Sequence, residues 1–544
     1  MNRGIGGSTF RNAEERLPLI PRPKIRWLPT RLMIGIMMFT ACWTNYMCRL
    51  QMPILAVPMI HSEGGNNTGG ACKTDDDSRV RRAISWLDPG LELEDYILSE
   101  RLKAAEQIAQ KSLNARVSRA STDDARPSDS PIELFNGSPF DWKPEVRGQL
   151  IAAYSYGNVP GNLLGGVMAV RWGPKKAILW TSVVAALVSL ISPILAQLHW
   201  VVLLLTRVIV GLAGGVTFPA CHSLVAQWSP PDEKSRFVWS LLGGTFGTIL
   251  TYPMVAMIAE NLKWENGWYI PSLLMLVWIL FWAVLTYDSP GEHPGISNKE
   301  KEYILESQAG TVRKTKPSLR DTPLKAILTS VPFLSLTCCH FGNLFILFFY
   351  QNSMMLYLTK ALGFELTKGG IAASLPWANR LLLGFVFSWG GDVLKRKEIV
   401  TLTILRKGAT VFSHLVPAVF LILVGYVGCR FVLANVFLVF ALGFNGAAAI
   451  SNLSNNQDLS PNFAGLLYGL MNTIGSMSGM IISPLVEEIA GKYGNPIEKW
   501  QILFWIGAGV CTVCMVIFVL GGSGNIQSWN EIRSEDDAEQ ARRD

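Results

Sequence analysis

The stretch LLLTRVIVGLAGGVTFPACH, residues 203–222, is apolar enough to cross a membrane, yet it contains Arg207. No carboxylate lies within it. An arginine at the centre of a membrane helix costs about 2.5–3.5 kcal/mol on insertion scales, so a compensating interaction must hold it there. The stretch predicts a membrane-spanning helix and marks Arg207 as a candidate functional residue.

The composition of the whole chain points the same way. Of its 544 residues, 49% are hydrophobic and only 16% are charged, and the mean hydropathy is +0.28. Soluble proteins carry about 25% charged residues, so the depletion of charge indicates a membrane protein. The net charge of +7 is concentrated in particular loops. It lacks the aromatic-interleaved basic patch of a nucleic-acid binder, and we expect no nucleic-acid partner.

Twelve apolar segments reach the length of roughly 20 residues that a spanning helix needs. They lie at about 33–59, 148–170, 176–196, 201–227, 237–259, 268–287, 328–357, 369–390, 409–428, 431–453, 464–489 and 501–521. The predicted fold is therefore an all-α membrane protein of twelve transmembrane helices in two six-helix halves. Segment 5 contains GGTFGTILTYP, residues 243–253, whose glycines favour close helix packing.

Short loops predict the orientation, because Lys and Arg accumulate on the cytoplasmic side. The loops after segments 2 and 8 are basic, and so is the connection between the halves. Both termini are expected to be cytoplasmic. The predicted divisions are a tail at 1–32, an N-terminal half at 33–287 with a lumenal or extracellular loop at 60–147, a cytoplasmic linker at 288–327, a C-terminal half at 328–521 and a cytoplasmic tail at 522–544.

The long loop at 60–147 carries two sequons for N-glycosylation, at Asn66 and Asn136. Cys72 lies in this loop, and Cys429 lies in a predicted loop on the same side, so a disulfide between them is one reading. The other seven cysteines lie in apolar runs and are interpreted as small hydrophobic residues.

The N-terminal tail reads EERLPLIPRP, residues 14–23. Glu15, Leu19 and Ile20 fit an acidic dileucine sorting signal, in which an acid is followed by three spacers and a Leu-Leu or Leu-Ile pair. A clathrin adaptor is the expected partner of this tail.

Three arginines lie inside predicted spans: Arg49, Arg207 and Arg380. Each could extend its side chain to the membrane surface, or each could line a water-accessible cavity that binds an anion, since a guanidinium suits carboxylate or phosphate. No Asp or Glu lies at the middle of a span, which favours the substrate as the missing partner. His340, in segment 7, is either a proton-coupling group or a packing histidine.

Several stretches resemble the anion-transporting branch of the major facilitator superfamily, which includes sialin, the vesicular glutamate transporters and the type I sodium/phosphate cotransporters. They include YMCRLQMPILAV (46–57), GVTFPACH (215–222) and SPNFAG (460–465), and the likeness covers about residues 30–530. The sequence GGVMAVRWGPKK (165–176) partly matches the signature of the superfamily, with Val170 at its acidic position, and SWGGDVLKRK (388–397) is a loose second copy. Sialin-like members are the most similar in appearance.

The resemblance implies transport of organic anions by alternating access. It assigns anion binding to Arg49 and Arg207 and cavity positions to Tyr46, Tyr154 and Asn158. Asn343 falls where vesicular glutamate transporters have an arginine, and His340 matches a histidine of sialin. Arg380 is an addition to the pattern of the family.

One departure concerns coupling. Proton-coupled relatives carry a glutamate seven residues after the segment 4 arginine, and sialin has another three residues after it. Here these positions are Gly214 and Val210. Their identity argues against the usual proton symport, while H⁺ and Na⁺ both stay open as coupling ions.

The sequence therefore predicts a secondary transporter of small organic anions, such as sialic acid or acidic amino acids, or of phosphate. The alternative is a non-transporting anion sensor or trafficking partner with a transporter fold. We expect no enzymatic activity, no cofactor and no metal. A lysosomal or vesicular membrane is favoured over the plasma membrane.

Overall fold

The computed structural model describes residues 29–60, 72, 140–230, 237–308 and 323–530. Helices make up nearly all of this part, and its β structure is limited to an isolated bridge between Ile60 and Phe140. The all-α fold predicted from hydropathy is confirmed. The sorting signal at Glu15, Leu19 and Ile20 and the sequons at Asn66 and Asn136 lie outside the described residues.

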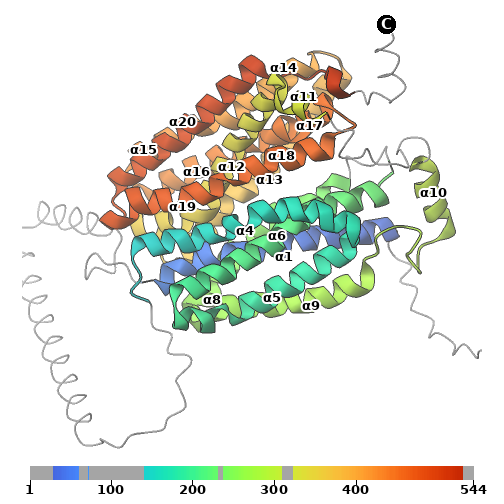
Figure 1. Cartoon of the computed structure of the whole chain (residues 1–544). Coiled ribbons are helices and arrows are strands. Elements are labelled where there is room, and N and C mark those ends of the chain that lie inside the picture. The colour runs from blue at the N-terminus through green and yellow to red at the C-terminus, as the bar shows by residue number, and fades with distance from the viewer. Residues whose placement is uncertain (1–28, 61–71, 73–139, 231–236, 309–322, 531–544) are drawn as a thin grey trace, which may run out of the picture.

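The N-terminal half forms one layer of the molecule (Figure 1). Prolines stand in the first turn of two of its helices, where the missing N–H leaves no hydrogen bond unmade. The helices are α1 (Thr30–Met59), α4 (Pro144–Arg171), α5 (Pro174–Leu198), α6 (Trp200–Trp228), the short η2 (Val238–Leu242), α8 (Gly243–Leu262), α9 (Asn266–Leu285) and α10 (Asn298–Gln308).

The C-terminal half forms the second layer (Figure 1). Four of its spans combine consecutive helical pieces, two of them through π-helical turns, η4 and η5. The elements are α11 (Leu324–Leu328), α12 (Val331–Leu356), η4 (Tyr357–Ala361), α13 (Leu366–Arg396), α14 (Leu402–Thr410), η5 (Val411–Leu415), α15 (Val416–Val427), α16 (Phe431–Asn445), η6 (Gly446–Ile450), α17 (Asn452–Leu459), α18 (Ala464–Ser476), α19 (Ser478–Ile489), η7 (Gly491–Tyr493), α20 (Ile497–Gly521) and η8 (Ser528–Asn530).

Ten spans in the described residues are long and apolar enough to cross a membrane. Two further helices, α1 and α4, are 30 and 28 residues long but carry more polar side chains, and both pack inside the N-terminal layer. Together they make the predicted twelve-helix architecture. The two less apolar helices are also those that carry Arg49 and Tyr154.

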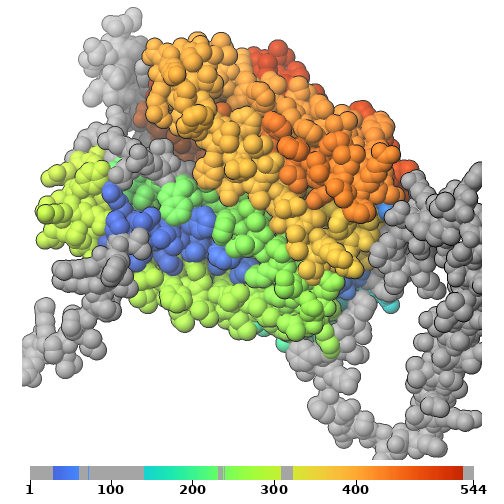
Figure 2. All heavy atoms as spheres, turned by 180° about the vertical axis from the view of Figure 1, so that it is seen from behind, coloured from blue at the N-terminus to red at the C-terminus, as the bar shows by residue number. Residues whose placement is uncertain are grey.

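The halves are joined more extensively at one side of the molecule. We call the side where α1 ends and α4 begins the loop face, and the opposite side, where α1 begins and α20 ends, the terminal face. Toward the loop face one hydrophobic core contains buried residues of both halves, such as Leu55 and Trp268 with Tyr350 and Trp500. Toward the terminal face each half has a core of its own. Figure 2 shows the seam between the blue and green half and the yellow and orange half.

Glycines set the distance between α1 and α8, as predicted for the stretch 243–253. A Cβ at Gly243 would lie 1.9 Å from the carbonyl oxygen of Phe39, and one at Gly247 would lie 2.6 Å from the Trp43 ring. These distances are too short for any larger residue, so the glycines allow the backbones to approach. This packing fixes α1, and therefore Arg49, within the N-terminal half.

A disulfide joins the two halves at the loop face. Cys72, which follows α1, pairs with Cys429, in the turn between α15 and α16, with a Cα–Cα distance of 5.3 Å and a sequence separation of 357 residues. The disulfide considered from the sequence for these two cysteines is confirmed. The other seven cysteines are free, and six of them are buried, as expected of small hydrophobic residues.

Candidate functional site

The position of Arg207 follows from the close packing of α4 on α6. Gly211 lies one turn after Arg207, and a Cβ there would be 2.0 Å from the carbonyl oxygen of Tyr154. Gly157 on α4 makes an equally close approach to the Val208 carbonyl. Because these glycines allow the two backbones to touch, the Arg207 guanidinium lies 5.9 Å from the centre of the Tyr154 ring.

Arg207 is fully buried and is held by the backbone of α1. Its Nη2 donates to the carbonyl oxygens of Cys48, at 2.9 Å, and Arg49, at 3.3 Å. Pro53 stands four residues after Arg49 and has no N–H, so the Arg49 carbonyl lacks its usual partner within the helix. The proline therefore makes available an acceptor that Arg207 uses, and this anchors α6 to α1.

The rest of the Arg207 guanidinium is unsatisfied. Its Nε and Nη1 are buried and have no hydrogen-bond partner, and none of its contacts in the described residues is with a carboxylate. The ring of Trp268 lies 5.1 Å away and makes a cation–π contact, which does not replace a counter-ion. A buried charge without a counter-ion is unfavourable, and the unused N–H donors of a guanidinium suit a carboxylate or a phosphate.

Arg49 itself supplies one of the two carbonyl groups that hold Arg207. Its guanidinium is surrounded by the aromatic rings of Tyr46 (5.6 Å), Tyr154 (5.1 Å) and Phe348 (4.2 Å). Phe348 belongs to α12 in the C-terminal half. Arg49 therefore lies at the interface of the halves, half-buried and without an ion pair to any described carboxylate.

Tyr154 connects both arginines to a hydrogen-bonded network. Its hydroxyl donates to Oδ1 of Asn45 at 3.1 Å, and Nδ2 of Asn45 donates to the carbonyl oxygen of Gly214 at 3.1 Å. A Cβ at Gly214 would lie 2.2 Å from the Tyr154 hydroxyl. The space that a glutamate would need is occupied, so the glycine at this position is required by the packing. Asn45 was not singled out from the sequence, although an amide inside an apolar run was a usable signal.

A second polar group lies in the C-terminal half, around Arg380 on α13. Its Nε donates to Oδ1 of Asn445 at 3.0 Å. Nδ2 of Asn445 in turn donates to Oδ1 of Asn343, at 3.0 Å, and to the Ser413 carbonyl, at 3.1 Å. Nδ2 of Asn343 is buried without a partner. The structure thus links Arg380 and Asn343 through Asn445, a residue that sequence reasoning missed.

His340 lies among amides. Nδ2 of Asn452 is 2.8 Å from its Nδ1, and Oδ1 of Asn472 is 3.4 Å from its Nε2. This arrangement satisfies a neutral imidazole, which is almost fully buried. The ring of Tyr468 packs against His340 and also against His222 of α6, with ring centres 6.0 and 5.2 Å apart. The Tyr468 ring is therefore a contact between the halves on the terminal-face side.

Tyr46 and Asn158 are the other two residues that were predicted to line the cavity, and they differ in what they contact. The half-buried ring of Tyr46 contacts Arg49 and packs edge-on against Phe218 of α6. Asn158 lies one turn after Tyr154 and accepts a hydrogen bond from Asn162 at 3.2 Å, rather than contacting an arginine. The described residues contain no group of three or more His, Cys, Asp or Glu side chains suited to a metal ion.

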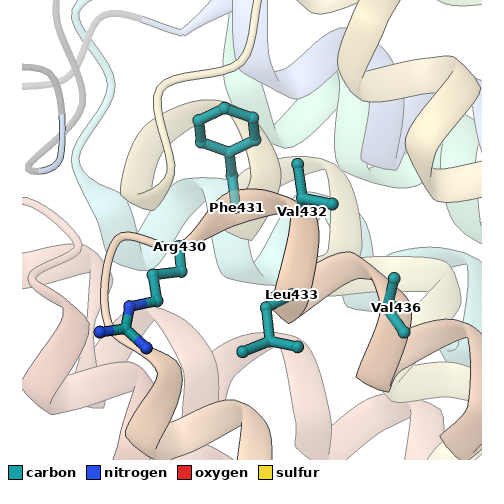
Figure 3. Close-up of a pocket in the computed structure, with 5 residues that line it drawn as sticks. All are labelled: Arg430, Phe431, Val432, Leu433 and Val436. Carbon is teal, nitrogen blue, oxygen red and sulfur yellow. The ribbon is translucent and has the colours of Figure 1, made fainter.

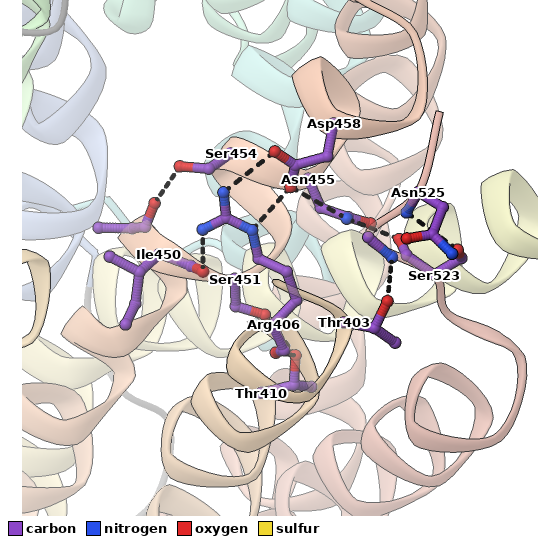
Figure 4. A network of polar contacts seen from close by, with 12 residues as sticks. Thr403, Arg406, Thr410, Ile450, Ser451, Ser454, Asn455, Asp458, Ser523 and Asn525 are labelled. Carbon is purple, nitrogen blue, oxygen red and sulfur yellow. Dashed lines mark hydrogen bonds and ion pairs between the residues drawn. The ribbon is translucent and has the colours of Figure 1, made fainter. Parts of the chain in front are cut away.

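Two other arginines in the bundle differ from these because each has its own carboxylate. Arg147 on α4 forms a two-pronged pair with Glu487 on α19, with both N–O distances at 2.7 Å. Arg406 on α14 pairs with Asp458 on α17 at 2.7 and 3.2 Å and also donates to the Ile450 carbonyl (Figure 4). These charges are neutralised within the fold, whereas Arg49, Arg207 and Arg380 have no carboxylate partner in the part of the chain that the structure describes.

A surface depression of about 330 Å³ at the start of α16 is a poor alternative site. It is lined by Arg430, Phe431, Val432, Leu433 and Val436. The five side chains point in different directions and do not converge (Figure 3). The group of unneutralised arginines at the interface of the halves is the stronger candidate.

The sequence of the chain is similar to those of known proteins. Residues 130–484 match the model of the Major Facilitator Superfamily. Human sialin is 28% identical over 404 residues, covering 74% of this chain and 80% of sialin. Human vesicular glutamate transporter 2 is 28% identical over 400 residues, covering 72% of this chain and 67% of that protein. The predicted resemblance to this branch is confirmed, and these relatives are transporters rather than enzymes.

A solved structure supports the fold alone. A bacterial homologue of the human lysosomal transporter Spinster, in an inward-facing and unoccupied conformation, has a TM-score of 0.58 and 10% sequence identity. The match covers 91% of this chain and 99% of that chain. The two-layer arrangement of helices is therefore that of known transporters.

Proposed function

The chain belongs to the Major Facilitator Superfamily, and from that premise we propose that it carries small organic anions or phosphate across a membrane by alternating access. The observation that carries the proposal is the contrast among the arginines of the bundle. Arg147 and Arg406 have carboxylate partners, whereas Arg49 and Arg207, which both contact the Tyr154 ring, have none among the described residues. An anionic substrate supplies the missing negative charge.

In this mechanism the anion binds between the halves. Arg207 offers Nε and Nη1, which are already oriented because Nη2 is bonded to the α1 backbone. Arg49 adds a second positive charge next to the C-terminal half, where Phe348 lies. The halves then rock about the bound anion and expose it to the other side. The shared core toward the loop face corresponds to a state closed on that side.

The surroundings of Gly214 bear on which ion is coupled to transport. Tyr154 and Asn45 fill the space beside Gly214, so a segment 4 carboxylate does not carry a proton here. Na⁺ coupling, or transport driven by the anion gradient and the membrane potential, fits this site. If uptake follows an imposed pH gradient, His340 is the group to replace.

Transport into proteoliposomes tests the proposal, with pH, sodium and voltage gradients imposed separately. We expect Arg207→Gln to lower anion uptake by at least about thirtyfold, which corresponds to about 2 kcal/mol for removing a buried charged partner. Arg396→Gln is the matched control, because it removes an exposed arginine of α13. Undiminished uptake by Arg207→Gln, or binding of anions by the wild type without flux, would contradict the proposal.

For the location we propose a lysosomal or vesicular membrane, with the plasma membrane as the alternative. The proposal rests on the likeness to sialin and the vesicular glutamate transporters and on the dileucine pattern at Glu15, Leu19 and Ile20. In this topology both termini are cytoplasmic, and Asn66 and Asn136 face the lumen or the exterior. Enzymatic removal of N-linked glycans should increase the electrophoretic mobility of the protein and abolish any difference from an Asn66→Gln, Asn136→Gln variant.

A further inference from the structure

We propose that the site is built for an anion with two separate negative groups, one held by Arg49 and Arg207 and the other by Arg380. This inference rests on the proposed function and narrows its substrate class. It starts from the number and position of the unneutralised arginines, which lie in both halves of the molecule.

Arg380 is oriented rather than freely mobile. Its Nε is bonded to Asn445, and Asn445 is itself fixed by Asn343 and by the Ser413 carbonyl. These partners come from α16, α12 and η5, so three elements of the C-terminal half support one guanidinium. Among the described residues the two terminal nitrogens of Arg380 have no ion-pair partner, which leaves them available to a ligand.

Helix α12 connects Arg380 to the N-terminal site. Arg380 is bonded to Asn445, and Asn445 is bonded to Asn343 on α12. Five residues further along the same helix, the Phe348 ring lies 4.2 Å from the Arg49 guanidinium. One arginine from each half is therefore associated with α12, and an anion with two separate negative groups lying along this helix is suited to contact both.

The balance of charge favours a ligand with more than one negative group. Elsewhere in the bundle the ratio is one carboxylate to one arginine, as at Arg147 with Glu487 and Arg406 with Asp458. Arg49, Arg207 and Arg380 have no carboxylate partner among the described residues. A monoanion leaves two of these charges uncompensated in a site of low dielectric, and a dianion leaves one, which is less unfavourable.

The arrangement also connects recognition to movement. Arg49 and Arg207 belong to the N-terminal half and Arg380 to the C-terminal half, so only a ligand that reaches both stabilises the state in which the halves close around it. A ligand shifts a conformational equilibrium only by its differential affinity for the two states. Arg380 is thus a specificity-determining residue, because a monoanion bound at Arg49 gains little on closure.

The test uses matched carboxylic acids: butanoate with succinate, pentanoate with glutarate, and hexanoate with adipate. Uptake into proteoliposomes and thermal stabilisation of the detergent-solubilised full chain are measured for each pair. For at least one pair, the wild type should take up the diacid about ten times faster than the monoacid, a difference of about 1.4 kcal/mol. Arg380→Gln should reduce that ratio about tenfold, and Arg380→Lys should restore part of it because the charge is retained.

The outcomes separate this inference from the proposed function. Equal handling of monoacids and diacids by the wild type would overturn the inference and leave anion transport intact. So would an Arg380→Gln variant that loses both members of a pair equally, since that indicates a structural role. If no acid of the series binds, the inference fails, and the proposed function is then decided by uptake of phosphate and sialic acid. Arg396→Gln again serves as the control for loss of one arginine.

Discussion

Gly214 illustrates how one residue determines what the site can do. From the sequence it is a glycine at a position where proton-coupled relatives carry a glutamate. In the structure the Tyr154 hydroxyl and Oδ1 of Asn45 lie 2.2 and 2.6 Å from where its Cβ would be. Tyr154 also contacts Arg49 and Arg207, so the space given up at Gly214 is used to position both arginines.

Replacing this glycine should therefore impair the site. We expect Gly214→Ala to displace the Tyr154 ring and to lower anion uptake by about tenfold to a hundredfold, since small displacements of positioning groups have effects of this size. Gly214→Glu should be as defective and should not confer coupling to a pH gradient. Gly509→Ala on α20 is the control, because nothing lies within 4 Å of a Cβ there. Full uptake by Gly214→Ala would show that Tyr154 is not constrained in this way.

At the residue scale, charged side chains were predictable and their amide partners were not. Arg49, Arg207 and Arg380 stand out because a charge in an apolar run is costly. Asn45 and Asn445 do not, because an amide is tolerated in many packed helices and its role depends on contacts with distant segments. The bond from Asn445 to Asn343 spans 102 residues of chain and leaves no trace in the local pattern.

At the scale of elements, α4 and α19 are joined by a buried ion pair between the halves. The Arg147–Glu487 pair is almost fully buried, with side-chain exposures of 2% each. One turn away, Lys492 of η7 lies 3.3 Å from Glu145 at the start of α4. Both pairs lie near the loop face, where the common core of the halves also lies. The contact therefore holds the loop face closed and must be broken when that face opens.

Removal of one partner of this pair should favour opening at the loop face. Glu487→Gln leaves Arg147 buried without its counter-ion, which costs about 3–5 kcal/mol. We expect a lower melting temperature and faster labelling of a Ser155→Cys reporter, which packs on Gly479 of α19, by an impermeant thiol reagent. Arg147→Met with Glu487→Leu should recover much of the melting temperature. Glu365→Gln, which breaks an exposed pair with Lys368, is the control. Labelling that is unchanged in Glu487→Gln would argue against a role in closure.

Hydropathy located the spanning helices but not their internal breaks. The predicted segments agree with the helices to within a few residues in most cases, such as 464–489 against α18 and α19. The π-helical turns η4 and η5 were not predicted, because they depend on how each helix packs against its neighbours. Ser413 lies in η5, and its carbonyl supports Asn445, so one of these irregular turns contributes to the site.

At the scale of the whole molecule, the two halves share a core toward the loop face and have separate cores toward the terminal face. In alternating access the halves separate at the loop face and come together at the terminal face, so the contacts at the loop face have to be reversible. The Cys72–Cys429 disulfide is different in kind, because it is a covalent connection between the halves that persists in every state. We therefore expect it to limit how far the loop face separates.

Cutting this connection should widen the loop-face opening and weaken the fold. We expect Cys72→Ser and Cys429→Ser to behave alike, and the double variant to behave like either one, because each removes the same bond. Spin labels on the loop-face ends of α4 and α19 should show a longer maximum distance than in the parent protein. A disulfide that closes so long a loop also stabilises a fold by about 2–4 kcal/mol, so the melting temperature should fall. Cys338→Ser removes a half-buried free thiol and should change neither quantity. The bond acts on the distance between the halves rather than on the arginines. The preference for diacids should therefore be retained in both single variants and in the double variant that lack the disulfide. Loss of that preference would show that the disulfide also affects the binding site.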